Sequence, residues 1–286
     1  SPAHPGLRTV APVDYALGDE LARGGMGRIR RARDLRLGRP LAVKELLASD
    51  PALAERFERE IRLTARLQHP SIVSIYEAGR WPTGEPFYAM RMVPGKGFDA
   101  VIKPLEKLAD RLALLPNMIA ICEALAYAHD QNIIHRDLKP GNVLIGPFGE
   151  TVVIDWGLAK DLSAADDSAP PTVPMRAASS ADKPPSKPPS KPPSSDSNLT
   201  LAGSVMGTPA YMPPEQAAGE TVDERADVYS LGAILYHLLA GRPPFVAKRS
   251  DELLVKVLSK SPASLAEIDE DIPRDLITIV EKAMAR

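Results

Sequence analysis

The stretch that decides the fold is His135-Arg136-Asp137-Leu138-Lys139-Pro140-Gly141-Asn142, followed by Val153-Ile154-Asp155-Trp156-Gly157. Between the two, short apolar runs flank a Gly-Pro-Phe-Gly turn at 146–149. This pattern predicts a β-hairpin, whose two ends lie together. We therefore expect Asn142 and Asp155 to face one point. Two oxygen ligands beside a further carboxylate suit Mg²⁺, which takes few protein ligands and completes its shell with water and phosphate.

This stretch resembles the catalytic loop and metal-binding segment of the eukaryotic-like (bacterial-type) serine/threonine protein kinases. The resemblance implies that Asp137 accepts the proton of the substrate hydroxyl and that Lys139 steadies the γ-phosphate of ATP. It also implies that Asn142 and Asp155 hold the magnesium ions. His135 is interpreted as a packed structural residue. The alternative is a buried Asp–Asn turn that only braces a loop, and the further motif matches below disfavour it.

Composition limits the classes of function. The 286 residues include 35 basic and 37 acidic ones, and the net charge of −2 gives no positive field for nucleic acid. The single cysteine, Cys122, excludes an internal disulfide and favours a reducing compartment, and its helical, apolar surroundings predict a core thiol. No apolar run reaches about 18 residues, so the sequence predicts no transmembrane helix in this chain. We expect a cytoplasmic domain, whether or not the whole protein is larger and tethered to a membrane.

A glycine-rich turn follows the first predicted strand. Residues 15–21 alternate apolar and polar side chains, and a second strand follows the turn. Glycine lets the backbone approach a phosphate chain closely. The turn resembles the kinase glycine-rich loop: Gly24 and Gly27 match, whereas Ala22 replaces the first glycine. A glycine-rich hairpin without a ligand is the alternative.

Lys44 ends a short apolar strand, where a lysine is usually a solvated edge residue. By resemblance it is the lysine that binds the α- and β-phosphates. Segment 52–67 has the apolar spacing of an amphipathic helix and follows an Asp-Pro pair that can cap it. Among its acids the resemblance selects Glu60 as the partner of Lys44, and Glu55 and Glu58 are expected to be solvated. Placement of this helix would then control activity.

Two more strands are predicted at 72–76 and 87–90, joined by a turn at 81–84. By resemblance this region lines the adenine site, with Met90 as gatekeeper and Arg91 to Val93 as the hinge. The resemblance also makes three apolar residues sandwich the adenine, although all three could be plain core residues: Ile29, Ala42 and Leu144.

Composition changes abruptly after Lys160. Residues 161–198 are rich in Ser, Pro, Ala, Asp and Lys, and the unit Lys-Pro-Pro-Ser occurs three times in tandem at 183–186, 187–190 and 191–194. Such repeats favour extended polyproline II without a packed core, so we predict a disordered insertion in the activation segment. Segment 183–194 is either a docking site for a proline-motif binder or a passive linker.

Residues 199–215 resemble the end of the kinase activation segment, with Pro-Pro-Glu in place of Ala-Pro-Glu. By resemblance Thr208 contacts the catalytic loop, and Glu215 ends the motif. Arg136 marks kinases whose activation segment is ordered by phosphorylation, because a phosphate can pair with the arginine. The candidate phosphorylation sites are, in order, Thr200 and Ser204.

The rest of the chain predicts helices near 110–131, 223–240, 250–259 and 273–285. The first carries Leu114, Met118, Cys122, Leu125 and His129 on its expected inner face. By resemblance Asp227 anchors the backbone of the catalytic loop. The sequence stops before the family's next helix, whose arginine pairs with the residue that matches Glu215, so we expect that ion pair to be missing.

The fold class implied by the resemblance is α+β, a bilobal protein-kinase-like fold with ATP between the lobes. We expect a tail at 1–13, an N-lobe with a sheet and one helix at 14–93, and a mainly helical C-lobe at 94–286. The predicted function is transfer of the γ-phosphate of ATP, with Mg²⁺, to Ser or Thr of protein substrates. Trp156 in place of Phe, together with the missing first glycine, keeps a nucleotide-binding pseudokinase as the alternative, and a small-molecule phosphotransferase is a third hypothesis.

Overall fold

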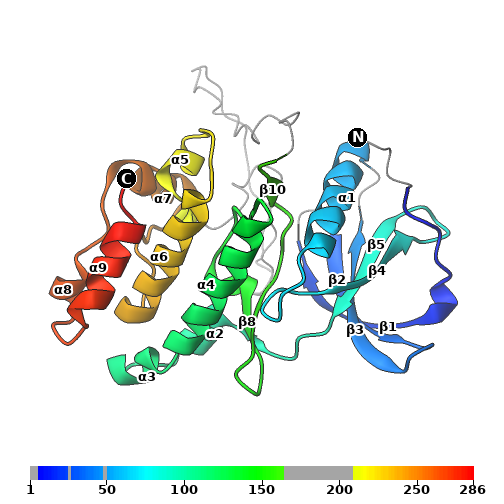
Figure 1. The fold of residues 1–286 in the computed structure, drawn as a ribbon, viewed down its shortest axis with the longest axis horizontal. Helices are drawn as coiled ribbons and strands as arrows, with labels where there is room; N and C mark the ends of the chain where they lie inside the picture. The colour runs from blue at the N-terminus through cyan, green and yellow to red at the C-terminus, as the bar shows by residue number, and fades with distance from the viewer. Residues whose placement is uncertain (1–5, 25–26, 48–49, 164–208) are drawn as a thin grey trace, which may run out of the picture.

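The computed structural model describes residues 6–24, 27–47, 50–163 and 209–286. The chain forms two lobes, one built on a sheet with a single helix against it and the other built mainly of helices (Figure 1). The predicted α+β bilobal fold is therefore confirmed. The predicted insertion at 161–198 falls mostly outside the described residues. Its first three residues, 161–163, are described. Lys160–Asp161 form strand β10, which pairs with β7 (Ile133–Ile134), so the C-lobe fold continues into the start of the predicted insertion.

The N-lobe sheet has five antiparallel strands in the order β1-β2-β3-β5-β4. Helix α1, Pro51–Arg66, packs on one face, and the side chain of Asp50 caps it by accepting a hydrogen bond from the N–H of Ala52. The strands are β1 Tyr15–Arg23, β2 Gly27–Asp34, β3 Arg39–Leu46, β4 Ile75–Arg80 and β5 Pro86–Arg91.

The fourth strand starts three residues later than the sequence predicts. Ile72 and Val73 do not join the N-lobe sheet; they lie against Val153 of the other lobe. Val73 N–H donates to the carbonyl of Val153 at 3.1 Å, and Val153 N–H donates to the carbonyl of Ser71 at 2.8 Å. Both apolar side chains are buried there, so tertiary pairing overrides the local strand pattern.

Apolar side chains cover both faces of the N-lobe sheet. On the α1 side, Phe57 and Ile61 pack on Leu46 and Tyr88. On the other face the indole of Trp81 stacks on Phe87 with ring centroids 3.7 Å apart. The tryptophan predicted within a turn is thus largely buried, at 8% exposure.

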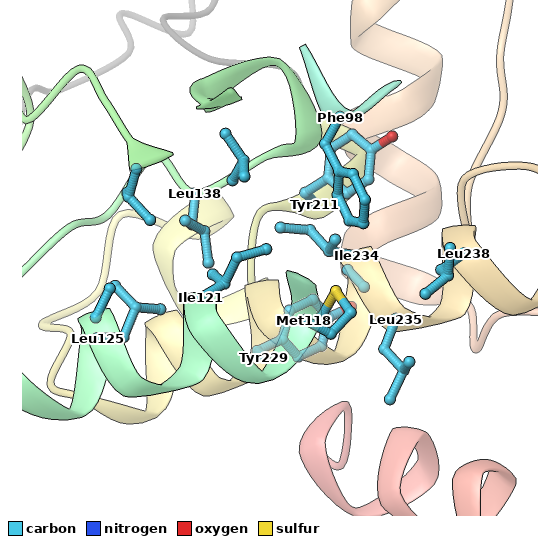
Figure 2. Close-up of a cluster of buried hydrophobic side chains, with 14 of the residues drawn as sticks. Phe98, Met118, Ile121, Leu125, Leu138, Tyr211, Tyr229, Ile234, Leu235 and Leu238 are labelled. Atoms are coloured by element: carbon cyan, nitrogen blue, oxygen red, sulfur yellow. The ribbon is translucent and has the colours of Figure 1, made fainter. Parts of the chain in front are cut away.

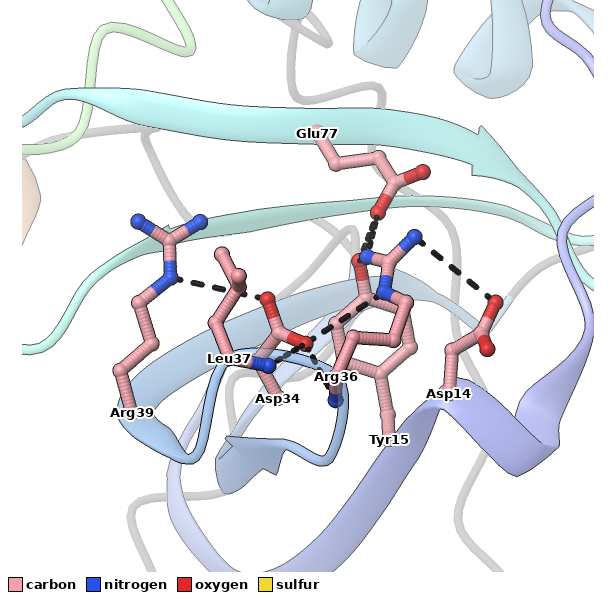
Figure 3. Close-up of polar contacts among 7 residues, drawn as sticks. All are labelled: Asp14, Tyr15, Asp34, Arg36, Leu37, Arg39 and Glu77. Carbon is pink, nitrogen blue, oxygen red and sulfur yellow. Dashed lines mark hydrogen bonds and ion pairs between the residues drawn. The ribbon is translucent and has the colours of Figure 1, made fainter.

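A polar network joins the start of β1 to the β2–β3 turn and to β4 (Figure 3). The hydroxyl of Tyr15 donates to Glu77, and the guanidinium of Arg36 reaches the same carboxylate at 2.7 Å. Asp34 accepts from the N–H groups of Arg36 and Leu37, at 3.0 and 3.3 Å, which closes the turn. These groups satisfy the buried Asp34 carboxylate at the edge of the lobe.

Part of the predicted N-terminal tail is ordered against the sheet. Thr9 lies opposite Arg80 of β4 in parallel, and Val10 packs on the apolar cluster beneath Trp81. A short helix, Pro12–Asp14, then leads into β1. Residues 7–10 adopt this path because the edge of β4 offers backbone partners and the apolar side chains gain cover.

In the C-lobe, α4 and α6 form the centre of a buried cluster that includes Met118, Ile121, Tyr229, Ile234 and Leu238 (Figure 2). The elements of this lobe are the short strands β6 Lys96–Gly97, β7 Ile133–Ile134, β8 Val143–Ile145, β9 Thr151–Val153 and β10, and the helices α2 Phe98–Ile102, α3 Leu108–Leu112, α4 Leu115–Asp130, α5 Pro214–Ala217, α6 Arg225–Ala240, α7 Ser250–Ser259, α8 Leu265–Ile268 and α9 Arg274–Ala283.

The long helix predicted at 110–131 is two helices. A break precedes α4, which carries Pro116 in its first turn, where a missing N–H costs nothing. The inner face of α4 is Met118, Ile121, Leu125 and Ala128, so the prediction of a core position for Cys122 is wrong: the residue is exposed. Cys122 directly follows Ile121 of the buried stripe, so it points away from the core. Partial burial still raises the pKa of its thiol.

Residues 108–130 are the one helical stretch in the described part of the chain that is long and apolar enough for a membrane span. Length and composition alone are a weak indication, because core helices pass the same test. Here the stretch is divided between α3 and α4, and α4 contacts the catalytic hairpin and α6. It serves as the scaffold beneath the hairpin.

Candidate active site

The predicted hairpin is present. Strands β8 and β9 pair antiparallel, with Val143 opposite Val153. One step further, the N–H of Ile154 donates to the carbonyl of Asn142 at 2.9 Å. Asn142 and Asp155 therefore sit at the same open end of the hairpin, as the pattern of apolar runs and glycines predicts.

Three polar side chains of the catalytic loop contact one another beside this end. The ammonium of Lys139 lies 2.8 Å from Oδ2 of Asp137. Asn142 donates its amide N–H to the backbone carbonyl of Asp137 at 2.8 Å and to its Oδ2 at 3.2 Å. Since Asn142 uses its nitrogen for the loop, its amide oxygen remains for a cation.

Asp227, at 0% exposure, holds the loop from below. Its carboxylate accepts from the backbone N–H of His135 at 2.8 Å and of Arg136 at 2.9 Å. A ring nitrogen of His129 lies 2.9 Å from the same carboxylate. Arg136 has φ +64°, a left-handed conformation that costs free energy for a non-glycine residue. The hydrogen bonds that these two N–H groups donate to Asp227 fix the backbone in this conformation.

His135 is buried and contacts Trp156 with ring centroids 4.6 Å apart. Its Nδ1 accepts from the N–H of Asp137 at 3.2 Å, and its Nε2 lies 3.2 Å from the carbonyl of Ile154. The ring thus joins the catalytic loop to the segment after β9. This arrangement agrees with the structural role predicted for His135.

The N-lobe supplies a lysine to the same place. Lys44 Nζ lies 2.6 Å from Oε1 of Glu60 and 3.3 Å from Oδ1 of Asp155, so the predicted pair with Glu60 is present. Burial alone would lower the pKa of this ammonium, but Tyr88 and the two carboxylates raise it well above its usual value. In turn Lys44 lowers the pKa of the Asp155 carboxyl, so both groups are charged at neutral pH.

Two contacts of α1 have no signal in the sequence. The hydroxyl of Tyr88 donates to Oε1 of Glu60 at 2.6 Å, because the β3–β5 register places Tyr88 opposite Lys44. Glu58, predicted to be solvated, instead forms ion pairs with Arg62 and with Arg80 of β4. Glu58 directly follows the buried Phe57, and from there its side chain reaches Arg80 on the edge strand β4. Cross-element pairs of this kind depend on register, which spacing along one helix does not contain.

The glycine-rich turn joins β1 and β2, with Ala22 opposite Ile29. The N–H of Gly24 donates to the carbonyl of Gly27 at 2.9 Å. A Cβ on Gly27 would lie 2.1 Å from the carbonyl oxygen of Glu45, so this glycine is required by the close approach of β3. Nothing lies within 4 Å of a Cβ built on Gly24, and that position is open.

The residues predicted around the adenine come from both lobes. Ala42 is buried and lies opposite Met90, which packs on the cores of both lobes. Arg91 donates its backbone N–H to the carbonyl of Ser74, and Val93 packs against the C-lobe core. Leu144 is half-buried on β8, opposite Gly97.

The activation segment is described only at its ends. Thr200, Ser204 and Thr208 lie outside the described residues. Arg136 donates through Nε to the carbonyl of Leu158 at 2.6 Å. Among the described residues Glu215 forms no ion pair, whereas its neighbour Gln216 donates to the carbonyl of Arg136 at 2.7 Å. Gln216 is a contact that the sequence analysis missed, since only the fold brings α5 to the loop.

Within the described ranges no group of three or more His, Cys, Asp or Glu side chains could hold a metal ion. The candidate cation site therefore rests on one amide and one carboxylate, Asn142 and Asp155. So few protein ligands suit Mg²⁺, which keeps several waters and binds substrate phosphates. The donor set fits this ion better than zinc or calcium, which take more protein ligands.

Comparison with known proteins agrees with this geometry. The protein kinase domain family matches residues 15–285. Serine/threonine-protein kinase PknB of Mycolicibacterium smegmatis is 36% identical over 279 residues, and PknB of Mycobacterium tuberculosis is 34% identical over the same length. A probable serine/threonine-protein kinase PknB of Bifidobacterium longum is 35% identical over 283 residues. Each alignment covers 95% of this chain but 36% to 40% of the relative, so the chain spans about two fifths of the relatives' length. The chain belongs to the protein kinase family and is a eukaryotic-like serine/threonine kinase catalytic domain.

Proposed function

We propose that the protein containing this domain transfers the γ-phosphate of ATP to Ser or Thr hydroxyls of other proteins. The observation that carries the proposal is the meeting of Lys44 from the N-lobe with Asp155 from the C-lobe, at 3.3 Å. Two parts of the chain 111 residues apart thereby bring a fixed positive charge to a carboxylate that suits Mg²⁺. Phosphoryl transfer depends mainly on such positioning and charge neutralisation.

In this proposal each polar residue has one task. Lys44 binds the α- and β-phosphates and is held by Glu60. Asp137 accepts the proton of the attacking hydroxyl, and Lys139, 2.8 Å from it, steadies the transferred phosphate. Because Lys139 and Asn142 both contact Asp137, the carboxylate is oriented before the substrate arrives.

Asn142 and Asp155 would hold Mg²⁺ through their side-chain oxygens. When bound, the ion neutralises phosphate charge and orients the phosphates. The low pKa of Asp155 supports this assignment, because the carboxylate is ionised without needing the metal. The nucleotide itself would be covered by the glycine-rich loop with Ala22, Gly24 and Gly27. Its adenine would be flanked by residues of both lobes, with Arg91 and Val93 contributing backbone groups of the hinge: Ile29, Ala42, Met90, Arg91, Val93 and Leu144.

The test of this function is phosphate transfer from labelled ATP to a generic basic protein. Asp137→Asn should lower kcat by about 10²–10⁴, the usual worth of a positioned base. Chelation of Mg²⁺ should abolish transfer, and added Mg²⁺ should restore it. Wild-type turnover in Asp137→Asn would contradict the role of Asp137. Nucleotide binding without any transfer by the wild-type protein would favour the pseudokinase alternative.

Regulation by phosphorylation of the activation segment is part of the proposal. A phosphate adds about −1.5 to −2 charge and could pair with Arg136. Thr200 is the first candidate and Ser204 the second. Mass spectrometry of protein incubated with ATP should find phosphate on 199–208; a fully active protein with this peptide unmodified would contradict the idea.

The proposed partners are protein substrates with accessible Ser or Thr, and Thr208 and Glu215 would contribute to the surface that binds them. Docking of a proline-motif binder at 183–194 remains a prediction from composition. A cytoplasmic location is also proposed, since ATP is the substrate and the single cysteine permits no internal disulfide.

A further inference from the structure

Residues 7–10, called here the N-terminal strap, lie along the outer edge of the N-lobe sheet. β4 is the last strand in the sheet order, so without the strap its outer edge would carry unpaired backbone groups. The strap fills this edge. Val10 N–H donates to the carbonyl of Arg80, and Arg80 N–H donates to the carbonyl of Arg8, each at 2.9 Å. The strap is therefore paired with β4 through its backbone.

Gly79 of β4 allows this approach. A Cβ at this position would lie 2.5 Å from Cγ2 of Val10 and 3.0 Å from the carbonyl oxygen of Arg8. It would also lie 3.2 Å from the ring of Phe87. A residue with a side chain at position 79 would have to displace the strap, so the sequence of β4 is matched to it.

The strap reaches helix α1 by two routes. Leu7 is half-buried and packs on the apolar cluster that contains Phe57 and Ile61 of α1. Arg80, whose backbone binds the strap, also pairs through its guanidinium with Glu58 of α1. Both routes end within three residues of Glu60, on the turns of the helix that surround it.

We propose that Leu7 is a positioning residue for phosphoryl transfer, which acts through α1; this rests on the proposed kinase function. Glu60 reaches Lys44 at 2.6 Å because α1 lies close against the sheet. Leu7 packs on the apolar cluster that the helix forms with the sheet. Without Leu7 the helix loses cover there and moves outward, and the pair that orients Lys44 is lost.

Hydrogen exchange tests this placement without any need for activity. In the full chain, Leu7→Asp should raise the exchange rates of amides 51–66 about tenfold, a typical size for coupling between sites. The separate variant Leu7→Met should keep the wild-type exchange rates of these amides, because methionine has nearly the same volume and keeps the apolar contact. Val13→Asp is the matched control, since Val13 is 74% exposed in the short helix that follows the strap. Unchanged exchange of α1 in Leu7→Asp would overturn the proposal.

A double-mutant cycle then asks whether the strap acts through Glu60. Leu7→Asp should lower kcat/KM about tenfold at a temperature where the variant is folded, and Gly79→Val, which displaces the strap by a second route, should do the same. In the Leu7→Asp background Glu60→Gln should cost clearly less than in the wild type, because the pair is already broken. Additive losses would overturn the proposal. If the wild-type protein transfers no phosphate, the proposed function fails, and the exchange experiment still decides the role of the strap.

Discussion

The hydroxyl of Tyr88 lies 2.6 Å from Oε1 of Glu60, the same oxygen that receives the ammonium of Lys44. Burial and the nearby carboxylate raise the pKa of Tyr88 well above its usual value, so the hydroxyl stays protonated and donates. Glu60 is 2% exposed, and its other oxygen has no hydrogen-bond partner among the described residues. The tyrosine therefore fixes the carboxylate from the sheet while the lysine binds it.

Tyr88→Phe should destabilise the protein and weaken catalysis together. A hydrogen bond to a charged group contributes about 1.5–3 kcal/mol, so the free energy of unfolding should fall by roughly that amount. Loss of the fixed Glu60 orientation should also lower kcat/KM several-fold. Urea unfolding and steady-state kinetics measure the two effects. Tyr76→Phe is the matched control, because Tyr76 is 40% exposed on β4, and an equal loss there would contradict the assignment.

Asp227→Asn should be more damaging than any surface change on α6. The amide keeps one acceptor oxygen but places an N–H₂ group against the backbone N–H of either His135 or Arg136, because these two donors bind different carboxylate oxygens. One buried N–H donor is then left unpaired. We expect a loss of about 3–5 kcal/mol in the free energy of unfolding, the usual result of breaking a buried charged contact. Asp223→Asn, two residues before the same helix and in a surface ion pair with Arg225, should cost less than about 1 kcal/mol. Chemical denaturation of both variants provides the comparison.

Trp156→Phe should leave the protein folded and active. The indole is 1% exposed, and its N–H has no acceptor among the described residues. Phenylalanine removes that unpaired donor, which offsets part of the lost packing, so the change in unfolding free energy should stay below about 1.5 kcal/mol. Trp156→Ala should instead cost about 3–5 kcal/mol through the cavity it leaves. An inactive Trp156→Phe would show that the tryptophan has a specific role in this domain.

Acidification should destabilise the domain partly through His237. Burial lowers the pKa of this ring below its usual value of 6.5, although Asp99 opposes the shift. The folded state therefore keeps His237 neutral, bonded to the hydroxyl of Tyr211 at 2.8 Å, while the unfolded state takes up a proton as the pH falls through 6.5. Stability from this group is present above the unfolded pKa and is lost below it.

The matched experiment compares urea unfolding at pH 7.5 and pH 5.5 in the wild type and in His237→Gln. The difference between the two pH values should be smaller in the variant, which cannot bind the proton. Because both proteins share all other titrating groups, an equal pH dependence would assign the acid sensitivity elsewhere.

How far the sequence predicts this domain depends on the range of each interaction. The hairpin, the cap at Asp50 and the Lys44–Glu60 pair follow from local patterns or from motif order, and each is present. Contacts that depend on the register between distant strands do not follow from spacing. Tyr88 reaches Glu60 only because β3 and β5 align in one register, and no rule for a single helix contains that information.

The errors have a similar origin. Cys122 has an apolar neighbourhood in sequence, yet the helix turns it away from the core, because the buried stripe of α4 runs through Ile121 and Leu125. Ile72 and Val73 look like the start of a strand, but Val153 of the other lobe takes them. In each case the packing of the folded domain decided between two locally acceptable arrangements.

The pairing of Ser71 and Val73 with Val153 limits how the two lobes can move. The chain crosses between lobes at Arg91 to Gly97, and this backbone ladder ties them at a second point. A body attached to another at two separate points keeps one rotational degree of freedom, about the line that joins them. Opening for nucleotide exchange would then be a swing about this axis, and it would separate Lys44 of one lobe from Asp155 of the other.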